Sequence, residues 1–345
     1  MKSLQLKMFM ITALVALAAC DKSNRSISIL GEDQTFQQIS NFQPRKIDIL
    51  WIVDNSGSMG SSQTNLVSNF GSFINRFQSL NYDFHMAVQT SDAFLGKFKN
   101  EDYRRRLKDG ANGNFSGVYV MDRNTPNLSS VFLTNATQGI NGSGDERAFS
   151  SFLDTLDYVG NADFRRPDAF LAIIIVSDED DFSATTTTFL NNDYNSPNLI
   201  PVSTYKNFLD GFAGASNYSV NAITILDNAC LAKLNSSFSG RRIGQRYIDL
   251  ANQSNGVKAS LCGDFAQSLQ LISDTIITTA QSFVIDREPV PGTLKIYVNG
   301  VEVLENPTTG YTYDAATRTV TFSTAASPPA GASIQVVYDP LTLRD

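Results

Sequence analysis

The chain has 345 residues, of which 42% are hydrophobic and 10% aromatic, and its formal net charge is −7. This length predicts two domains with ancillary segments, and this composition is typical of a globular protein rather than a disordered or multispanning one. The acidic balance argues against a nucleic-acid partner, because phosphates would repel the chain. A single histidine, His85, argues against a histidine-ligated zinc site and against catalysis of the Ser-His-Asp or Cys-His kind.

The N-terminal residues 1–19 have the features of a secretory leader. Lys2 and Lys7 give the charged region, and the apolar run that follows is too short to span a membrane comfortably. The run ends in Leu-Ala-Ala-Cys20, which resembles the lipobox of bacterial lipoproteins. The resemblance implies that Cys20 becomes the lipidated first residue of a protein anchored to the inner or outer membrane of the cell envelope, facing the periplasm or cell surface. An ordinary cleaved signal peptide that ends near a cysteine is the alternative.

Two further cysteines, Cys230 and Cys262, remain in what would be an exported and oxidising setting. An even remainder there favours a disulfide, which would close a loop of about 32 residues and stabilise the fold by ~3 kcal/mol in the chain-entropy model. Two free buried thiols are the alternative. The spacing is not C-x-x-C, so it does not indicate a reactive thiol pair.

Residues 20–44 are polar and predict a tether between the anchor and the folded body. Strand and helix patterns then alternate. We expect a strand at 47–53, a helix at 63–80, a strand at 82–89, a long polar stretch at 91–141 with a short strand at 118–121, a helix at 145–156, a strand at 169–176, a helix at 205–212, a strand at 220–226, and helices at 244–252 and 264–280. The alternation predicts an α/β domain over 45–282, with a mostly parallel sheet between helix layers.

The sequence changes character after residue 282. Short alternating β-branched runs follow, and Asn299-Gly300 between two of them is a strong hairpin signal. Residues 283–345 therefore predict a second, all-β domain similar to a small sandwich, and no chemistry is recognisable in it.

Oxygen-bearing side chains follow two of the predicted strands. Asp54, Ser56 and Ser58 come directly after the strand at 47–53, and Asp178 comes after the strand at 169–176. The carboxyl ends of parallel strands meet at one sheet edge, where ligands of open α/β sheets bind. Hydroxyl and carboxylate oxygens suit Mg²⁺, Ca²⁺ or Mn²⁺. The sequence thus predicts a divalent-cation site.

Asp54-x-Ser56-x-Ser58, with Asp178 closing a later apolar strand, resembles the metal-ion-dependent adhesion site (MIDAS) of von Willebrand factor A (vWA) domains. The resemblance implies a Rossmann-like fold over 45–282 and a cation held by two hydroxyls, two water-linked aspartates and a threonine. Neutral hydroxyls leave the ion electron-poor, so that it takes one more anionic oxygen from a partner protein. It also suggests a bacterial lipoprotein branch of these domains, which supports the disulfide.

One position departs from the family pattern. The loop 142–147 stands where the family's threonine lies and places Glu146 at that position, with Asp145 as the fallback. A carboxylate there would neutralise more of the ion's charge, raise cation affinity and weaken the attraction for an acidic partner group. The alternative is that Glu146 lies in a helix first turn, favoured by the helix dipole.

Three further acidic residues follow Asp178. We expect Glu179, Asp180 and Asp181 to form a solvated acidic loop, with a second cation there as the alternative.

These patterns predict a membrane-anchored, non-enzymatic lipoprotein that binds a partner protein through Mg²⁺, with Ca²⁺ or Mn²⁺ as alternatives. One rival is a hydrolase that uses Asp54, Glu146 and Asp178 to hold an activating ion. The other is an envelope scaffold with a purely structural metal.

Overall fold

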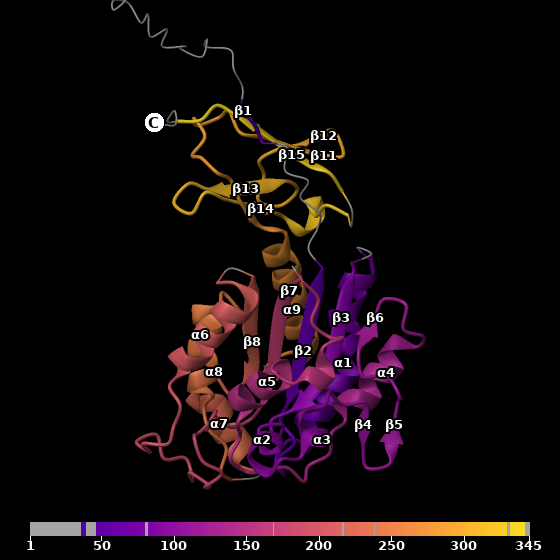
Figure 1. Cartoon of the computed structure of the whole chain (residues 1–345), viewed down its shortest axis with the longest axis vertical. Helices are drawn as coiled ribbons and strands as arrows, with labels where there is room; N and C mark the ends of the chain where they lie inside the picture. The colour runs from indigo at the N-terminus through magenta and orange to yellow at the C-terminus, as the bar shows by residue number, and fades with distance from the viewer. Residues whose placement is uncertain are drawn as a thin grey trace, which may run out of the picture.

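The computed structural model describes residues 36–38, 46–79, 82–167, 169–215, 217–237, 239–329 and 332–341. The predicted signal peptide and Cys20 lie outside these residues. An α/β body and a smaller β part are stacked along the long axis of the molecule (Figure 1).

The body is built on a six-stranded sheet. Its strand order is β6 (Met121–Asp122), β3 (Phe84–Thr90), β2 (Ile47–Val53), β7 (Phe170–Val176), β8 (Tyr218–Thr224) and β9 (Lys258–Ser260). All neighbours are parallel except β6 and β3. Every residue of β2, β7 and β8 is buried, as their apolar sequences require of strands covered on both faces. The predicted α/β class and mostly parallel sheet are confirmed.

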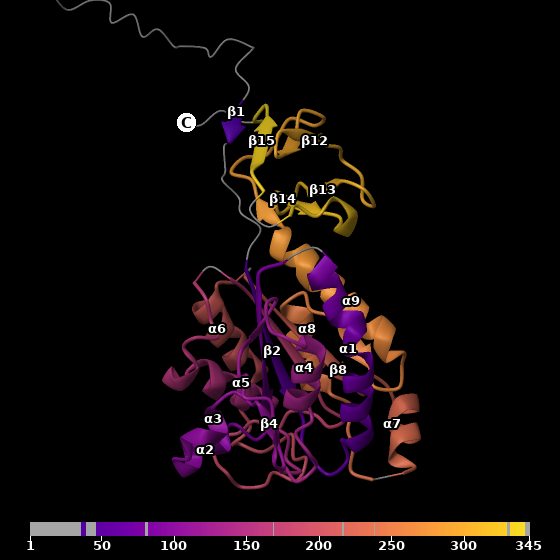
Figure 2. The same ribbon diagram turned by 90° about the vertical axis from the view of Figure 1, so that its right-hand side faces the viewer.

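Helices cover both faces of this sheet (Figures 1 and 2). On one face α1 (Gly60–Ser79) packs against α4 (Leu128–Ala136) and α9 (Phe265–Gln281). On the other face lie α5 (Ala148–Leu156), α6 (Val202–Ala213) and α8 (Gln245–Gln253). Trp51 on β2 is fully buried in the core between the sheet and α1, α4 and α9. Its ring centroid lies 5.0 Å from that of Phe73 and 5.3 Å from that of Phe132.

The polar stretch 91–141 contains more regular structure than the sequence predicts. It forms α2 (Leu95–Lys99), α3 (Asp102–Arg105), β4 (Gly110–Ala111), β5 (Asn114–Phe115), β6 and α4. The short strand expected at 118–121 is displaced: β6 covers Met121–Asp122, and residues 118–120 lie outside any strand. Hydrogen bonds of polar side chains, and not a periodic apolar pattern, hold this region in its fold. The buried Asn135 donates to Val118 O (2.8 Å) and accepts from Ser116 Oγ (2.7 Å).

The chain leaves β2 and β7 in opposite directions across the sheet. β2 continues through α1 to β3 on one side, whereas β7 continues through α6 to β8 on the other. Such a switch point leaves a crevice at the carboxyl ends of the two strands. His85 lies near the opposite, amino-terminal end of β3, where its Nδ1 is 3.0 Å from Phe164 O.

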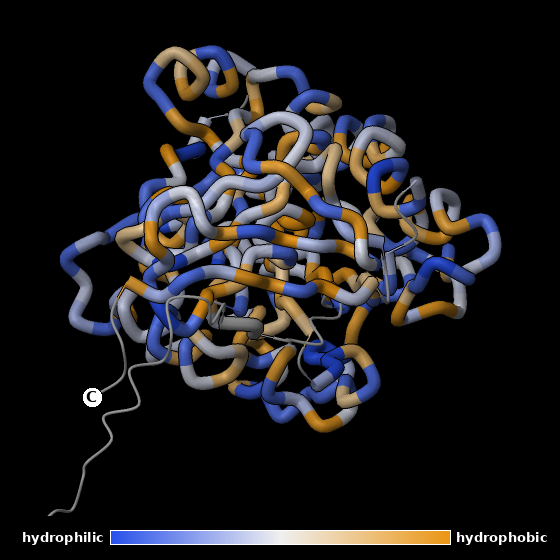
Figure 3. Tube along the Cα trace, turned by 90° about the horizontal axis from the view of Figure 1, so that it is seen from above, coloured by the Kyte–Doolittle hydropathy of each residue, from blue (hydrophilic) through white to orange (hydrophobic). Residues whose placement is uncertain are grey.

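Two antiparallel sheets form the β part. One has the order β1 (Phe36–Gln38), β15 (Ile334–Tyr338), β11 (Lys295–Val298) and β12 (Val301–Val303), and the other β10 (Phe283–Val284), β14 (Thr319–Phe322) and β13 (Tyr311–Asp314). They share a separate apolar core. Hydrophobic and hydrophilic stretches alternate along the chain in the view from this end (Figure 3). The predicted hairpin turn is present, with φ of 51° at Asn299 and 81° at Gly300.

The predicted tether differs from the structure in one place. Residues 36–38 form β1 and pair antiparallel with β15, so this piece of the segment belongs to a sheet. Three residues are too few to show an alternating pattern, and the pairing depends on the open edge of a strand about 300 residues further along the chain.

The β part contacts the body at the amino-terminal ends of its strands. Tyr82, just before β3, lies with its hydroxyl 2.9 Å from Ser327 Oγ, and Gln281 at the end of α9 donates to Pro328 O (3.3 Å). The carboxyl ends of β2 and β7 therefore lie at the far end of the body. Within the described ranges, no helix combines the length and the apolar character that crossing a membrane requires.

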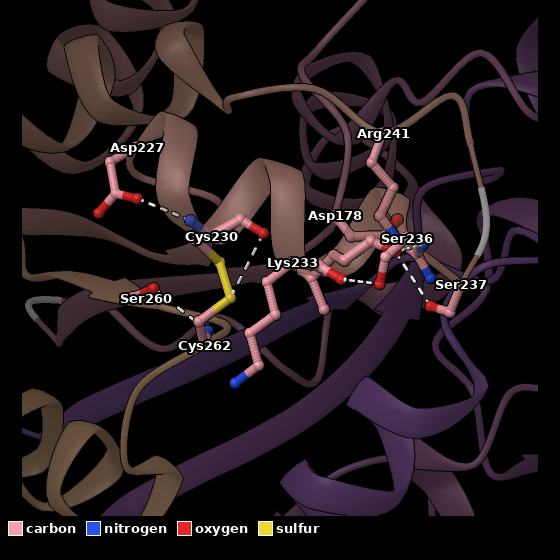
Figure 4. Close-up of a disulfide and its surroundings, with 10 residues drawn as sticks. Asp178, Asp227, Cys230, Lys233, Ser236, Ser237, Arg241, Ser260 and Cys262 are labelled. Atoms are coloured by element: carbon pink, nitrogen blue, oxygen red, sulfur yellow. Dashed lines mark hydrogen bonds and ion pairs between the residues drawn. A yellow bond between two sulfur atoms is a disulfide. The ribbon is translucent and has the colours of Figure 1, made fainter.

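The disulfide predicted between Cys230 and Cys262 is formed (Figure 4), with a Cα–Cα distance of 5.6 Å. It joins α7 (Asn228–Asn235) to the segment between β9 and α9.

Candidate cation site

Asp54 directly follows β2, at the sheet edge where the crevice lies. Its N–H donates to Val176 O on β7 (3.0 Å), which holds the two strand ends together. The buried carboxylate accepts from Ser56 N at Oδ1 (2.8 Å) and from Ser177 Oγ at Oδ2 (2.7 Å). These bonds orient the carboxylate within the turn that carries the two hydroxyls.

The hydroxyls of Ser56 and Ser58 lie side by side, with their Oγ atoms 3.1 Å apart. Ser58 donates its hydroxyl hydrogen to Asp178 Oδ1 (2.7 Å), so Ser56 is the donor in the contact between the two hydroxyls, and at least one lone pair of each Oγ remains available. Adjacent ligands of an octahedral Mg²⁺ at about 2.1 Å lie about 3.0 Å from each other. The structure thus brings Asp54, Ser56, Ser58 and Asp178 together, with a hydroxyl spacing that fits one small divalent cation.

Glu146 lies beside this cluster without a partner. It is 0% exposed, and neither carboxylate oxygen has a hydrogen-bond partner among the described residues. Burial, followed by the charge of Asp54, raises the pKa of Glu146 well above its ordinary value. The Ser91 hydroxyl opposes that rise, but it donates to Asn55 Oδ1 (3.3 Å). A buried carboxylate in this state requires a proton or a cation.

The donor set therefore fits a divalent cation. It combines two paired hydroxyls, two oriented aspartates and one unsatisfied carboxylate, all oxygen ligands. A cluster of three or more His, Cys, Asp or Glu side chains arranged as metal ligands is not found in the described part of the chain. Any cation here would depend on the hydroxyls of Ser56 and Ser58.

The structure shows where the two alternatives for the loop 142–147 place Glu146 and Asp145. α5 begins at Ala148, so Glu146 lies before the helix and not in its first turn. Asp145, the fallback ligand, accepts instead from Arg147 Nη2 (2.7 Å) and from Leu190 N (3.3 Å).

A glycine holds this loop against the Asp54 turn. Gly142 N donates to Asn55 O (2.7 Å), and a Cβ added at Gly142 would lie 2.6 Å from Asn55 Cγ. Only glycine permits this approach without displacing Asn55, and it brings the loop that carries Glu146 beside the hydroxyls.

The expectation of a solvated acidic loop is wrong. Glu179 is 8% exposed, and Asp180 and Asp181 are 0% exposed. Asp181 accepts from Phe149 N (2.9 Å) near the start of α5 and from Arg246 Nη2 (3.3 Å). Asp180 also accepts from Arg246, through its N–H (2.9 Å). Donors from distant segments keep these two aspartates in the interior and occupy the oxygens that a second cation would need.

Two residues at the site carried no signal in the sequence. Gln63 on α1 donates from Nε2 to Asp54 O and to Gly139 O, both at 2.8 Å. Arg241 donates from Nε to Asp178 Oδ2 (2.6 Å). Arg241 lies in the irregular segment between α7 and α8, where periodicity predicts nothing and no motif marks it.

We expect the metal-free protein to lose stability as pH rises from about 4 to about 8. Burial, with the charge of Asp178, raises the pKa of Asp54 from 3.8 to about 7, and burial, with the charge of Asp54, raises the pKa of Glu179 from 4.5 to about 8. In that range the native state holds protons that the unfolded chain has lost, so unfolding becomes easier with each increment of pH, and the effect saturates above about 8.

Thermal unfolding in excess chelator across this range measures the effect. The Asp54→Asn variant is the control, because it lacks one of the two groups and is expected to show a shallower slope. A melting temperature that rises between pH 5 and pH 8 would contradict the assignment.

Comparison with family models and with curated proteins finds no match. Among solved structures, the chain is similar to the pilus adhesin SpaC from Lactobacillus rhamnosus GG, with a TM-score of 0.42 and 11% identity, covering 88% of this chain and 42% of that one. It is also similar to proximal thread matrix protein 1 from the mussel byssus (TM-score 0.37, 11% identity, 74% and 52% covered). A third structure is the pilus adhesin RrgA from Streptococcus pneumoniae (TM-score 0.36, 10% identity, 88% and 57% covered). The chain thus spans about half the length of these proteins, and likeness at this level carries no conclusion about function.

Proposed function

We propose that residues 45–282 are a vWA-type domain whose MIDAS-type site holds Mg²⁺, with Ca²⁺ or Mn²⁺ as alternatives, and binds a partner protein through that ion. We further propose that the chain is a lipoprotein held in a bacterial envelope through Cys20, and that it is not an enzyme. The observation that carries the proposal is the pair of hydroxyls 3.1 Å apart on Ser56 and Ser58, beside the carboxylate of Glu146, which has no hydrogen-bond partner among the residues that the structure describes.

The chemistry of the donors supports binding rather than turnover. A divalent cation held through neutral hydroxyls keeps most of its positive charge and attracts a carboxylate from another protein. The hydrolase alternative needs a group that activates water. His85 is the only histidine of the chain, and it lies near the amino-terminal end of β3, away from the site. The geometry offers oxygen ligands for an ion, and no positioned imidazole.

The placement of the site also supports a surface role. The crevice lies at the carboxyl ends of β2 and β7, whereas β1 and the start of β2 lie toward the β part (Figure 1). A chain anchored upstream of β1 would therefore present the crevice away from the bilayer. This arrangement suits capture of a partner that is not embedded in the same membrane.

The test uses the mature chain purified in detergent. Titration calorimetry with Mg²⁺ measures cation binding, and capture from cell envelopes is compared with Mg²⁺ and with chelator. We expect Mg²⁺ to bind and capture to require it. Undiminished capture in chelator would contradict the metal-bridged mechanism.

Two further measurements address the rivals. Turnover of generic phosphoester or peptide substrates with Mg²⁺ or Mn²⁺ would favour the hydrolase. A large fall in melting temperature on chelation, with capture unchanged, would favour a purely structural metal.

A further inference from the structure

The cation site contains a fixed positive charge. We propose that Arg241 is a specificity-determining residue of this site: its guanidinium offsets the carboxylate that Glu146 adds, so that a bound cation keeps its attraction for an acidic group of a partner. This inference rests on the function proposed above and names what the site selects.

The guanidinium of Arg241 is held from three sides. Nε donates to Asp178 Oδ2 (2.6 Å), Nη2 to Ser58 O (3.2 Å) and Nη1 to Leu234 O (2.6 Å). The residue is 5% exposed. These contacts join the turn after β2, the end of β7 and the end of α7, so the charge cannot move away from the site without breaking all three.

The ion pair between Arg241 and Asp178 also sets the direction in which the Ser58 hydroxyl donates. Because Arg241 takes Oδ2, Oδ1 is the oxygen that accepts the hydrogen of Ser58 (2.7 Å). The hydrogen of Ser58 is thereby directed to Asp178, and a lone pair of its oxygen remains free for a cation.

The charges around the hydroxyl pair explain why a cation-binding site would contain an arginine. Four buried carboxylates lie there, on Asp54, Asp178, Glu146 and Glu179, and the charges of Asp54 and Glu179 act on the others. A divalent ion beside these carboxylates, if they were uncompensated, would be more than neutralised, and a further carboxylate from a partner would be repelled. The ion pair with Arg241 cancels one of these charges, and charges interact strongly where water is excluded.

Arg241 acts on the two binding steps with opposite sign. Its positive charge repels an incoming cation and so weakens cation affinity. The same charge reduces the negative field around the bound ion and so strengthens the binding of a carboxylate. A side chain needed only for folding would instead weaken both steps together.

The segment that carries Arg241 is itself anchored. Arg241 N donates to Asn235 Oδ1 (3.2 Å) at the end of α7, and the side chain of Asp227 caps the start of that helix through Cys230 N (2.8 Å). In Figure 4 the disulfide lies to one side of α7, and Arg241 and Asp178 lie to the other. The helix therefore links the disulfide to the cation site.

The test compares the mature wild-type chain with Arg241→Gln and Arg241→Lys. Mg²⁺ affinity is measured by titration calorimetry. Acetate serves as the carboxylate probe on the Mn²⁺-loaded protein, followed by water-proton relaxation, which falls when a carboxylate replaces ion-bound water. We expect Arg241→Gln to bind Mg²⁺ about tenfold more tightly and acetate about tenfold more weakly, because it removes one positive charge from the site. Arg241→Lys keeps the charge, and we expect it to remain closer to wild type in both.

Arg318→Gln is the matched control, because it removes the same net charge from an exposed residue of the β part, at the end of the molecule opposite the site. We expect neither affinity to change. An equal response in Arg318→Gln would overturn the proposal by showing a general charge effect. Loss of both affinities in Arg241→Gln, or no change in either, would also overturn it.

A double variant keeps the test decisive if Arg241→Gln does not fold. Arg241→Gln combined with Glu146→Gln removes one charge of each sign, and we expect its ratio of acetate to Mg²⁺ affinity to return toward wild type. The Glu146→Gln single variant is the reference, and a ratio in the double variant that stays as far from wild type as in Glu146→Gln would count against compensation. Wild-type protein that does not bind Mg²⁺ would overturn the proposed function itself, whereas Mg²⁺ binding with no response at Arg241 would overturn this inference alone.

Discussion

Replacing Asp54 with asparagine is expected to lower Mg²⁺ affinity by a factor on the order of 10–100 and to abolish cation-dependent capture of a partner. Asp54 orients the turn through Ser56 N (2.8 Å) and Ser177 Oγ (2.7 Å), and its charge is one that a cation would neutralise. The amide has nearly the same shape, so the turn can persist while the charge is lost. Titration calorimetry and the shift of melting temperature on adding Mg²⁺ measure the change.

The stability of the same variant separates a binding defect from a folding defect. A buried charge costs free energy when no cation compensates it, so we expect metal-free Asp54→Asn to be at least as stable as wild type at pH 8. Asp122→Asn is the matched control, because Asp122 lies on β6 opposite His85, near the amino-terminal end of β3. Wild-type Mg²⁺ affinity in Asp54→Asn would exclude this residue from the cation site.

Removing the disulfide through a Cys230→Ser and Cys262→Ser double substitution is expected to lower the free energy of unfolding by about 3–4 kcal/mol in the chain-entropy model. The bond closes a separation of 32 residues between α7 and the segment before α9. Without it, the unfolded chain gains freedom that the folded chain does not share. Denaturant unfolding at fixed pH with chelator measures the loss.

The proposed cation site gives this prediction a second readout. Arg241 bonds to Leu234 O at the end of α7, so loosening the helix is expected to shift Mg²⁺ and acetate affinities in the direction expected for Arg241→Gln, by a smaller factor. Wild-type protein treated with a thiol reductant is the control and should lose the same stability. Unchanged denaturation midpoints in both samples would show that the bond does not constrain the unfolded state.

The sequence predicts best where the signal is local and apolar. The strand expected at 47–53 has those bounds in β2, and the strand expected at 169–176 differs from β7 by one residue. An unbroken apolar run of this length is typical of a strand that is covered on both faces. The stretch 91–141 was harder to predict, because its short elements are fixed by hydrogen bonds of side chains such as Asn135 and not by a hydrophobic period.

The sequence by itself determined the hydroxyl pair and the carboxylates beside it. Asp54, Ser56 and Ser58 are two residues apart in one turn, and Asp178 follows a strand that must end at the same sheet edge. Only the tertiary structure showed that a positive charge, that of Arg241, lies among these carboxylates. Arg241 reaches Asp178 across 63 residues of chain, a pairing that no spacing or period encodes.

The burial of the acidic residues after Asp178 was likewise decided by the tertiary structure and not by the sequence. Three successive carboxylates indicate solvent when only the sequence is considered, because an unpaired charge is costly to bury. In the folded chain Asp181 accepts from the backbone near the start of α5 and from Arg246, which come from segments before and after it. Burial of a charge is decided by its partners, and those partners are assembled only by the fold.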